Sequence, residues 1–181
     1  HPYGMDFVKV ENVALVTGLD GTGEDPAPSP QRAALLAELY RREIKNPNEV
    51  LASPNTALVL VRGFLRPGIQ KGDHFDVEVR TPSRSDTTSL RGGWLMETRL
   101  TEMAVLGGQL KTGHEMAYAV GPILVDPSAS PDSDPALSTV GRVLTGGVAT
   151  KSRQLGLILD HQHQSYRLSQ LVGKAVSERF H

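Results

Sequence analysis

Residues 56–80, TALVLVRGFLRPGIQKGDHFDVEVR, decide the fold, because they contain two predicted strands and a turn-rich segment between them. At the end of this stretch, Phe75, Val77 and Val79 alternate with charged residues. This period of two predicts a strand with one buried and one solvated face. The first strand, residues 56–65, is apolar on both faces near its middle, which predicts a central place in a sheet. The intervening RPGIQKGD contains the Pro-Gly and Gly-Asp pairs that favour turns.

The same criteria predict strands and helices before and after this stretch. Ser29 is placed to cap a helix that begins at Pro30. A second helix is predicted at residues 165–180, where apolar residues recur at helical spacing. The apolar face predicted for the first helix, residues 30–44, consists of Ala33, Leu36, Leu39, Tyr40 and Ile44. The further predicted strands are residues 8–19, 94–100, 118–125, 140–152 and 155–160.

The order of these elements predicts an α+β fold, because the strands mostly follow one another without alternating with helices. A strand-rich body with few helices is expected at residues 1–137, and a small ββα unit at residues 138–181. The polar, proline-rich segment 126–138, DPSASPDSDPALS, buries little surface and is the best internal linker. A strand–strand–helix tail needs a partner sheet, whose natural third strand would follow residue 181. We therefore expect the unit to be truncated.

The composition is that of a globular chain, and it excludes several kinds of site. Of the 181 residues, 39% are hydrophobic and 22% are charged, which allows a buried core. The absence of cysteine excludes disulfides, a cysteine nucleophile and cysteine-ligated zinc. A net charge of −1 argues against nucleic acid as a partner, and no apolar stretch is long enough to predict a membrane span. The start, HPYGMDFVKV, lacks the apolar region of a signal peptide, so we expect an excised fragment or a mature piece.

The glycine-rich string GLDGTG at residues 18–23 raises the hypothesis of a phosphate cradle. A Walker A loop needs Lys followed by Ser or Thr after its last glycine, whereas Glu24 and Asp25 follow here. Two acids at this place would repel a phosphate, and no helix is predicted to begin directly after the loop. The sequence therefore favours a structural turn.

The HQH triplet raises the hypothesis of a metal site. His161 and His163, next to Asp160, could supply half of such a site. The triplet lies in a polar stretch between a predicted strand and a predicted helix, where a solvated turn is the usual structure. The chain has no nucleophile elbow G-x-S-x-G, and no spacing indicates a catalytic triad. We predict no catalytic residue, no metal, no cofactor and no enzymatic activity, with a hydrolase as the least favoured alternative.

Arginines give the centre of the chain a mildly basic character that would favour a carboxylate-bearing partner, such as peptidoglycan or an acidic protein surface. Arginines spread over strands also commonly serve solubility alone. Arg84 and Arg91 are our candidates for contacts in assembly or with the cell wall. The complete set is Arg62, Arg66, Arg80, Arg84 and Arg91.

Six strings, in this order along the chain, resemble the amino-terminal half of the flagellar P-ring protein family. The combination of GLDGTG with SLRGG is the most specific part of the resemblance, which covers nearly all of the chain. The strings are VTGLDGTGED (16–25), NTALVLVRGFLRPGIQKGDHFDVEV (55–79), SLRGGWLMETRL (89–100), YAVGPILV (118–125), VGRVLTGGVATKS (140–152) and LGLILDHQHQSYRLSQLVGKAVSERF (155–180).

The resemblance implies a non-catalytic, structural subunit of a closed periplasmic ring in the flagellar basal body, and hence a role in motility. It implies self-assembly around the flagellar rod, contacts with neighbouring ring proteins and with peptidoglycan, and no cofactor. Subunits of such a ring pack edge to edge, and the rotation between them must close. The motif glycines would set tight turns at Gly18, Gly21, Gly23, Gly92, Gly93, Gly146 and Gly147.

The sequence departs from the family pattern at two motifs. Thr88 stands where the family tends to have a basic residue before SLRGG, and Gly146 and Gly147 stand in place of Asn-Gly. These departures keep a second hypothesis open, in which the chain is a periplasmic module that binds peptidoglycan or polysaccharide in another envelope assembly.

Overall fold

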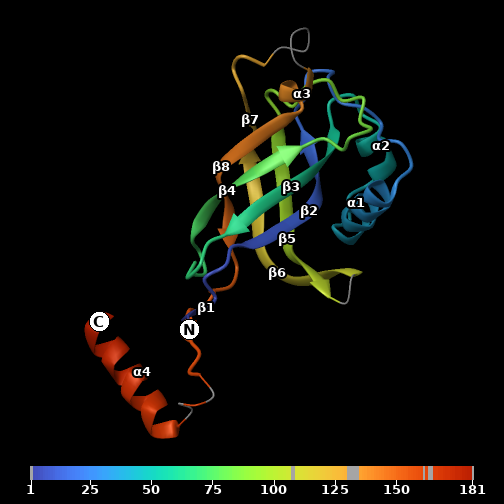
Figure 1. Cartoon of the computed structure of the whole chain (residues 1–181). Helices are drawn as coiled ribbons and strands as arrows, with labels where there is room; N and C mark the ends of the chain where they lie inside the picture. Colours follow the sequence, from blue (N-terminus) through green and yellow to red (C-terminus); the bar gives the residue numbers. More distant parts are fainter. Residues whose placement is uncertain (1, 107–108, 130–134, 161, 163–164, 181) are drawn as a thin grey trace.

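A computed structural model describes residues 2–106, 109–129, 135–160, 162 and 165–180. Its main feature is a sheet of seven antiparallel strands in the order β4-β3-β2-β5-β6-β8-β7. A further pairing of β4 with β8 closes six of these strands into a barrel (Figure 1). The strands are β2 (Val8–Thr17), β3 (Ala57–Leu65), β4 (His74–Arg80), β5 (Trp94–Leu106), β6 (Gln109–Pro122), β7 (Leu124–Val125) and β8 (Val140–Ala149).

The predictions for residues 56–80 are confirmed. β3 and β4 form an antiparallel pair in which Val61 lies opposite Val79. Val77 and Val79 are buried, whereas His74 and Asp76 are exposed. β3 pairs with β2 on one side and with β4 on the other, so it has the central place that its two apolar faces predict. The strand-rich chain with few helices confirms the α+β fold class.

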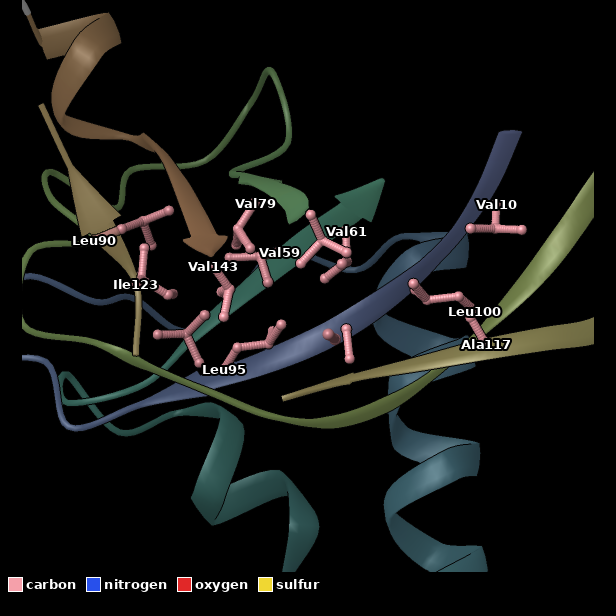
Figure 2. Packing of buried hydrophobic residues seen from close by; sticks show 14 of the residues in the cluster. Val10, Val59, Val61, Val79, Leu90, Leu95, Leu100, Ala117, Ile123 and Val143 are labelled. Atoms are coloured by element: carbon pink, nitrogen blue, oxygen red, sulfur yellow. The ribbon is translucent and has the colours of Figure 1, made fainter. Parts of the chain in front are cut away.

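The interior of the barrel is filled by aliphatic side chains from every strand of the ring. Figure 2 shows Leu95 of β5 among Val59, Val79 and Val143 of three other strands. Inward and outward side chains alternate along each strand, so burying one set fixes the register of the pairing. Small residues also take part, since Ala117 of β6 is fully buried.

Two helices cover one outer face of the barrel, α1 (Pro30–Arg41) and α2 (Pro47–Leu51). The predicted cap is present, because the backbone N–H of Arg32 donates to Ser29 Oγ at 3.1 Å. Leu35 and Leu39 of α1 pack on Leu15 and Leu58, the outward side chains of β2 and β3. Leu51 of α2 completes this second, smaller core, which accounts for the apolar outer face of β3.

The predicted apolar face of the first helix was partly wrong. Ala33 and Tyr40 are exposed, and the buried stripe consists of Leu35 and Leu39 with Leu36 beside them. The helix also ends before Ile44, because Glu43 takes up a left-handed conformation with φ of 57°. Ile44 still reaches the small core from the connection that follows.

The strands near the end of the chain pair differently from the predicted ββα unit. β8 joins β4 and β6 in the barrel, so the sheet crosses the predicted boundary between residues 137 and 138. The predicted strand at residues 155–160 is only the short β9 (Gly156–Leu157), which pairs with β1 (Pro2–Tyr3). The helices of this region are the short α3 (Pro135–Ser138) and α4 (Tyr166–Phe180), the second of which stands apart from the barrel in Figure 1.

No helix within the described residues combines the length and the apolar character that crossing a lipid bilayer would require.

Candidate functional site

The two most specific motifs of the sequence meet at one end of the barrel, which we call the glycine-loop end: residues 18–29 after β2 and residues 81–93 before β5. β2 and β5 are antiparallel neighbours, and Thr17 pairs with Trp94. The carboxyl end of one strand therefore lies beside the amino end of the other, and the loops that continue from them must lie together.

Direct hydrogen bonds join the two loops. Thr22 Oγ1 donates to the carbonyl of Ser89 at 2.8 Å, and the N–H of Thr88 donates to the carbonyl of Thr22 at 3.0 Å. Glu24 accepts from the N–H of Asp86 at 2.7 Å and from the hydroxyl of Ser85. An acid that would repel a phosphate thus serves as an acceptor between two loops. The sequence alone does not reveal this role of Glu24. Its donors, Ser85 and Asp86, lie 61 and 62 residues further along the chain, and no local sequence pattern identifies so distant a contact.

The motif glycines of this end act in two ways. Gly18, Gly21 and Gly92 have positive φ angles of 75°, 71° and 76°, which suit turns. Gly23 instead permits close packing, because a Cβ at this position would lie 1.9 Å from the carbonyl oxygen of Thr56. Gly93 is similar, since its Cβ would lie 2.6 Å from a methyl carbon of the buried Val16.

Gly146 and Gly147 differ from the prediction of a tight turn, because both lie inside β8. A Cβ on Gly147 would come within 2.7 Å of the ring of Phe75, and one on Gly146 within 2.3 Å of Val143. The pairing of β4 with β8 shifts register between Phe75 and Val77, opposite this part of β8. Gly147 therefore makes room for Phe75, and Gly146 makes room for Val143, near an irregular point of the strand pair that closes the barrel.

The two candidate contact arginines differ in their surroundings. The guanidinium of Arg91 donates to three carbonyls of the next loop, at 2.8 Å to Ala129, 3.2 Å to Asp126 and 3.5 Å to Pro127. Arg84 is exposed, and within the described residues its side chain has no recorded hydrogen bond or ion pair. Arg91 is therefore bound to the loop at residues 126–129, whereas the side chain of Arg84 is exposed to solvent.

Replacing Arg91 by alanine is expected to destabilise the chain by about 1 kcal/mol, because three carbonyls lose a charged donor. This corresponds to a fall in melting temperature of about 2–4 °C, measured by circular dichroism. Arg84→Ala is the matched control and is expected to change stability by less than about 0.5 kcal/mol. Equal effects of the two substitutions would contradict the structural role of Arg91.

Local hydrogen bonds lower the pKa of two solvent-accessible carboxylates, Asp73 and Asp126. The pKa of Asp73 lies below its ordinary value, chiefly because the N–H of Gln70 donates to its carboxylate at 3.1 Å and also because Arg66 donates at 3.0 Å. The pKa of Asp126 is lowered by the hydroxyl and then by the N–H of Ser128, at 2.7 and 2.8 Å. Asp73 closes the turn between β3 and β4, the segment RPGIQKGD of the sequence.

The lowered pKa of Asp73 predicts a pH dependence of stability. A depressed carboxyl pKa stabilises the fold at pH values above the unfolded pKa, and this contribution is lost as the pH falls through the folded pKa. Asp73→Asn is therefore expected to melt below the unmodified chain at about pH 7, and the difference is expected to shrink as the pH falls below the ordinary aspartate pKa of about 3.9. Melting curves across this range measure it. A difference that stays constant with pH would show that the ionised carboxylate does not hold the turn.

The hypothesis of a metal site at the HQH triplet remains untested, since His161 and His163 lie outside the described residues. In the rest of the chain, as far as the structure describes it, no group of three or more His, Asp or Glu residues could hold a metal ion.

Comparison with known proteins finds the same family that the motifs of the glycine-loop end resemble. The family model described as flagellar P-ring protein matches residues 6–180. The flagellar P-ring protein of Caulobacter vibrioides is 25% identical over 173 residues, which cover 92% of this chain and 45% of that protein. The Rhizobium etli protein of the same name is 29% identical over 177 residues, covering 92% and 46%. That of Sinorhizobium fredii is 34% identical over 139 residues, covering 74% and 35%.

The chain spans less than half of the length of these relatives. The family match nevertheless extends over the whole barrel and over α4. The chain therefore belongs to the flagellar P-ring protein family.

Proposed function

We propose that the chain acts as a structural subunit of a flagellar-type ring in the periplasm, which assembles with copies of itself around a rod and close to the cell wall. The observation that carries this proposal is the family match over residues 6–180. Its further partners would be the rod, the neighbouring ring proteins and peptidoglycan. A structural role needs no catalytic group, and we propose that the chain has no enzymatic activity.

The glycine-loop end supports a mechanical role rather than a chemical one. Its loops are held by bonds such as that from Thr22 to Ser89, and Glu24 is occupied by two donors. The N–H of Leu90 donates to the carbonyl of Ser138 at 2.9 Å, which ties the same loop to the segment before β8. A ring under load needs subunits whose loops keep their shape, and these cross-connections meet that need.

Three exposed apolar side chains of the barrel strands mark our candidate surface for the contact between subunits. Trp94, Leu124 and Leu144 are 47%, 54% and 52% exposed. Each of the three directly follows a buried residue in the chain. Because side chains alternate between the two faces of a strand, each of the three points outward. Leu124 and Leu144 lie on the neighbouring strands β7 and β8, and Trp94 lies on β5, on the other side of β6. Exposed apolar side chains are typical of protein contacts where they gather on one surface. In a ring this surface would meet a different surface of the next subunit.

Sedimentation velocity tests the proposal with the 181-residue chain. We expect the chain to assemble in a concentration-dependent manner at concentrations up to about 1 mM. A dissociation constant of about 1 mM corresponds to an association free energy of about 4 kcal/mol, so this range detects even weak association. Trp94→Glu is expected to weaken assembly, whereas Tyr40→Glu is the matched control, because Tyr40 is 59% exposed on the helical side. A chain that stays monomeric throughout this range would overturn the proposal. Co-sedimentation with purified cell wall tests the alternative, in which the chain is a periplasmic module that binds peptidoglycan or polysaccharide. A chain that stays monomeric but sediments with the cell wall would support that alternative.

A further inference from the structure

A cavity of about 300 Å³ lies on the outer face of the barrel, beside the start of α1. Residues of four strands line it together with Gln31 of the helix. Glu11 comes from β2, Arg62 from β3 and Arg80 from β4. Glu11 and Arg62 lie opposite each other, nearer to the ends of β2 and β3 that point away from the glycine-loop end.

The charge of Arg62 is only partly compensated at this cavity. Its Nε is buried and has no hydrogen-bond partner among the described residues. The nearest recorded carboxylate oxygen, Oε2 of Glu11, lies 3.6 Å away. The same oxygen is 2.6 Å from the ammonium nitrogen of Lys9, which is its closer partner. A buried donor without an acceptor is costly, so the site favours a ligand that supplies one.

A second guanidinium at the cavity, that of Arg80, also lacks a polar partner within the described part of the chain. Arg80 is partly buried, and its side chain has no recorded hydrogen bond or ion pair within the described part of the chain. Glu78 lies opposite Arg62 in the pairing of β3 with β4. Glu78 nevertheless makes no ion pair within 4.0 Å with any described cation. Two guanidiniums and one carboxylate therefore line the cavity, with a surplus of positive charge.

We propose that this cavity binds a carboxylate group on a short apolar stem. A guanidinium presents its N–H groups in a planar fork that matches the two oxygens of a carboxylate, which supplies the acceptor that Arg62 Nε lacks. Leu60 and Met103 provide an apolar wall for the stem. The volume lies at the lower end of the range for small-ligand pockets, so the site takes one short acidic group. That group is carried either by a small free acid or by a glutamate side chain of a peptide segment.

The Nε–H signals of the arginines, observed by ¹H–¹⁵N NMR of the 181-residue chain, test this proposal. Butyrate serves as the small free acid, and the blocked tripeptide Ala-Glu-Ala serves as the peptide source. We expect a saturable shift of the Arg62 Nε–H signal with both probes, and none with Ala-Gln-Ala. A tripeptide that binds at least about tenfold more tightly than butyrate assigns the site to a protein segment, and equal affinities assign it to a small acid.

Two variants make the test specific. Arg80→Gln is expected to weaken binding of the better probe by about tenfold or more, because it removes one of the two guanidiniums. Arg167→Gln, on the exposed face of α4 and outside the cavity lining, is the matched control and is expected to leave the affinity unchanged. The backbone amide spectrum of each variant verifies that it is folded. The proposal is overturned if the Arg62 signal does not saturate, or if both variants weaken binding equally.

Discussion

Replacing Gly23 by alanine is expected to destabilise the chain by about 3 kcal/mol, a cost of overpacking at the upper end of the usual range. The added Cβ would lie 1.9 Å from the carbonyl oxygen of Thr56 and 2.8 Å from that of Pro54. The N–H of Gly23 also donates to the Pro54 carbonyl at 2.8 Å, so the loop cannot move away without losing this bond. For a chain of this size the melting temperature should fall by about 6–12 °C.

Gly21→Ala is the control for this prediction. Gly21 lies in the same loop and has a positive φ of 71°, but nothing lies within 4 Å of a Cβ at this position. Its substitution is expected to cost only about 1 kcal/mol, from backbone strain alone. Thermal melting followed by circular dichroism measures both variants. Equal costs would mean that the loop at residues 18–29 does not pack on residues 54–56 as described.

Replacing Leu95 by alanine is expected to cost about 2–5 kcal/mol, because it leaves a cavity at the centre of the barrel. Leu95 is fully buried, and Figure 2 shows it among Val59, Val79 and Val143. Those neighbours come from β4 and β8, which pair to close the barrel, and from β3, which lies beside β4. The barrel is therefore expected to melt cooperatively and at a lower temperature in this variant.

The matched control is Leu144→Ala, which removes the same atoms from a side chain that is 52% exposed. This change is expected to alter the free energy of unfolding by less than about 0.5 kcal/mol. Urea unfolding monitored by the fluorescence of the single tryptophan, Trp94, gives both values. If Leu95→Ala were as mild as the control, β5 would not contribute to a shared interior.

The parts of the fold that local patterns determine could be predicted from the sequence. The alternation in residues 74–80 gave the buried face of β4, and the doubly apolar β3 proved to lie between the barrel interior and the helices. Ser29 and Pro30 located the start of α1. Each of these features depends on residues close together in the chain, where spacing and backbone preference suffice.

The parts that depend on distant pairing could not be predicted. β8 looked like the partner of residues 155–160, whereas it closes the barrel against β4. Gly146 and Gly147 suggested a turn in the sequence, because only the packing of the folded barrel, with Val143 against Gly146 and Phe75 against Gly147, explains why the strand needs glycine there. Hydrogen bonds across the glycine-loop end have the same origin, since Thr22 and Ser89 lie 67 residues apart. A single sequence carries no periodic signal for such contacts.

Electron microscopy of the concentrated, chemically cross-linked chain tests the central claim most directly. That claim is that the chain is a structural subunit which assembles with copies of itself into a closed ring. Contacts between two different surfaces of identical subunits give a closed ring when the rotation between them closes and a filament when it does not. We expect closed rings of a single diameter that are absent in the Trp94→Glu variant. Single particles only, or open filaments, would contradict it.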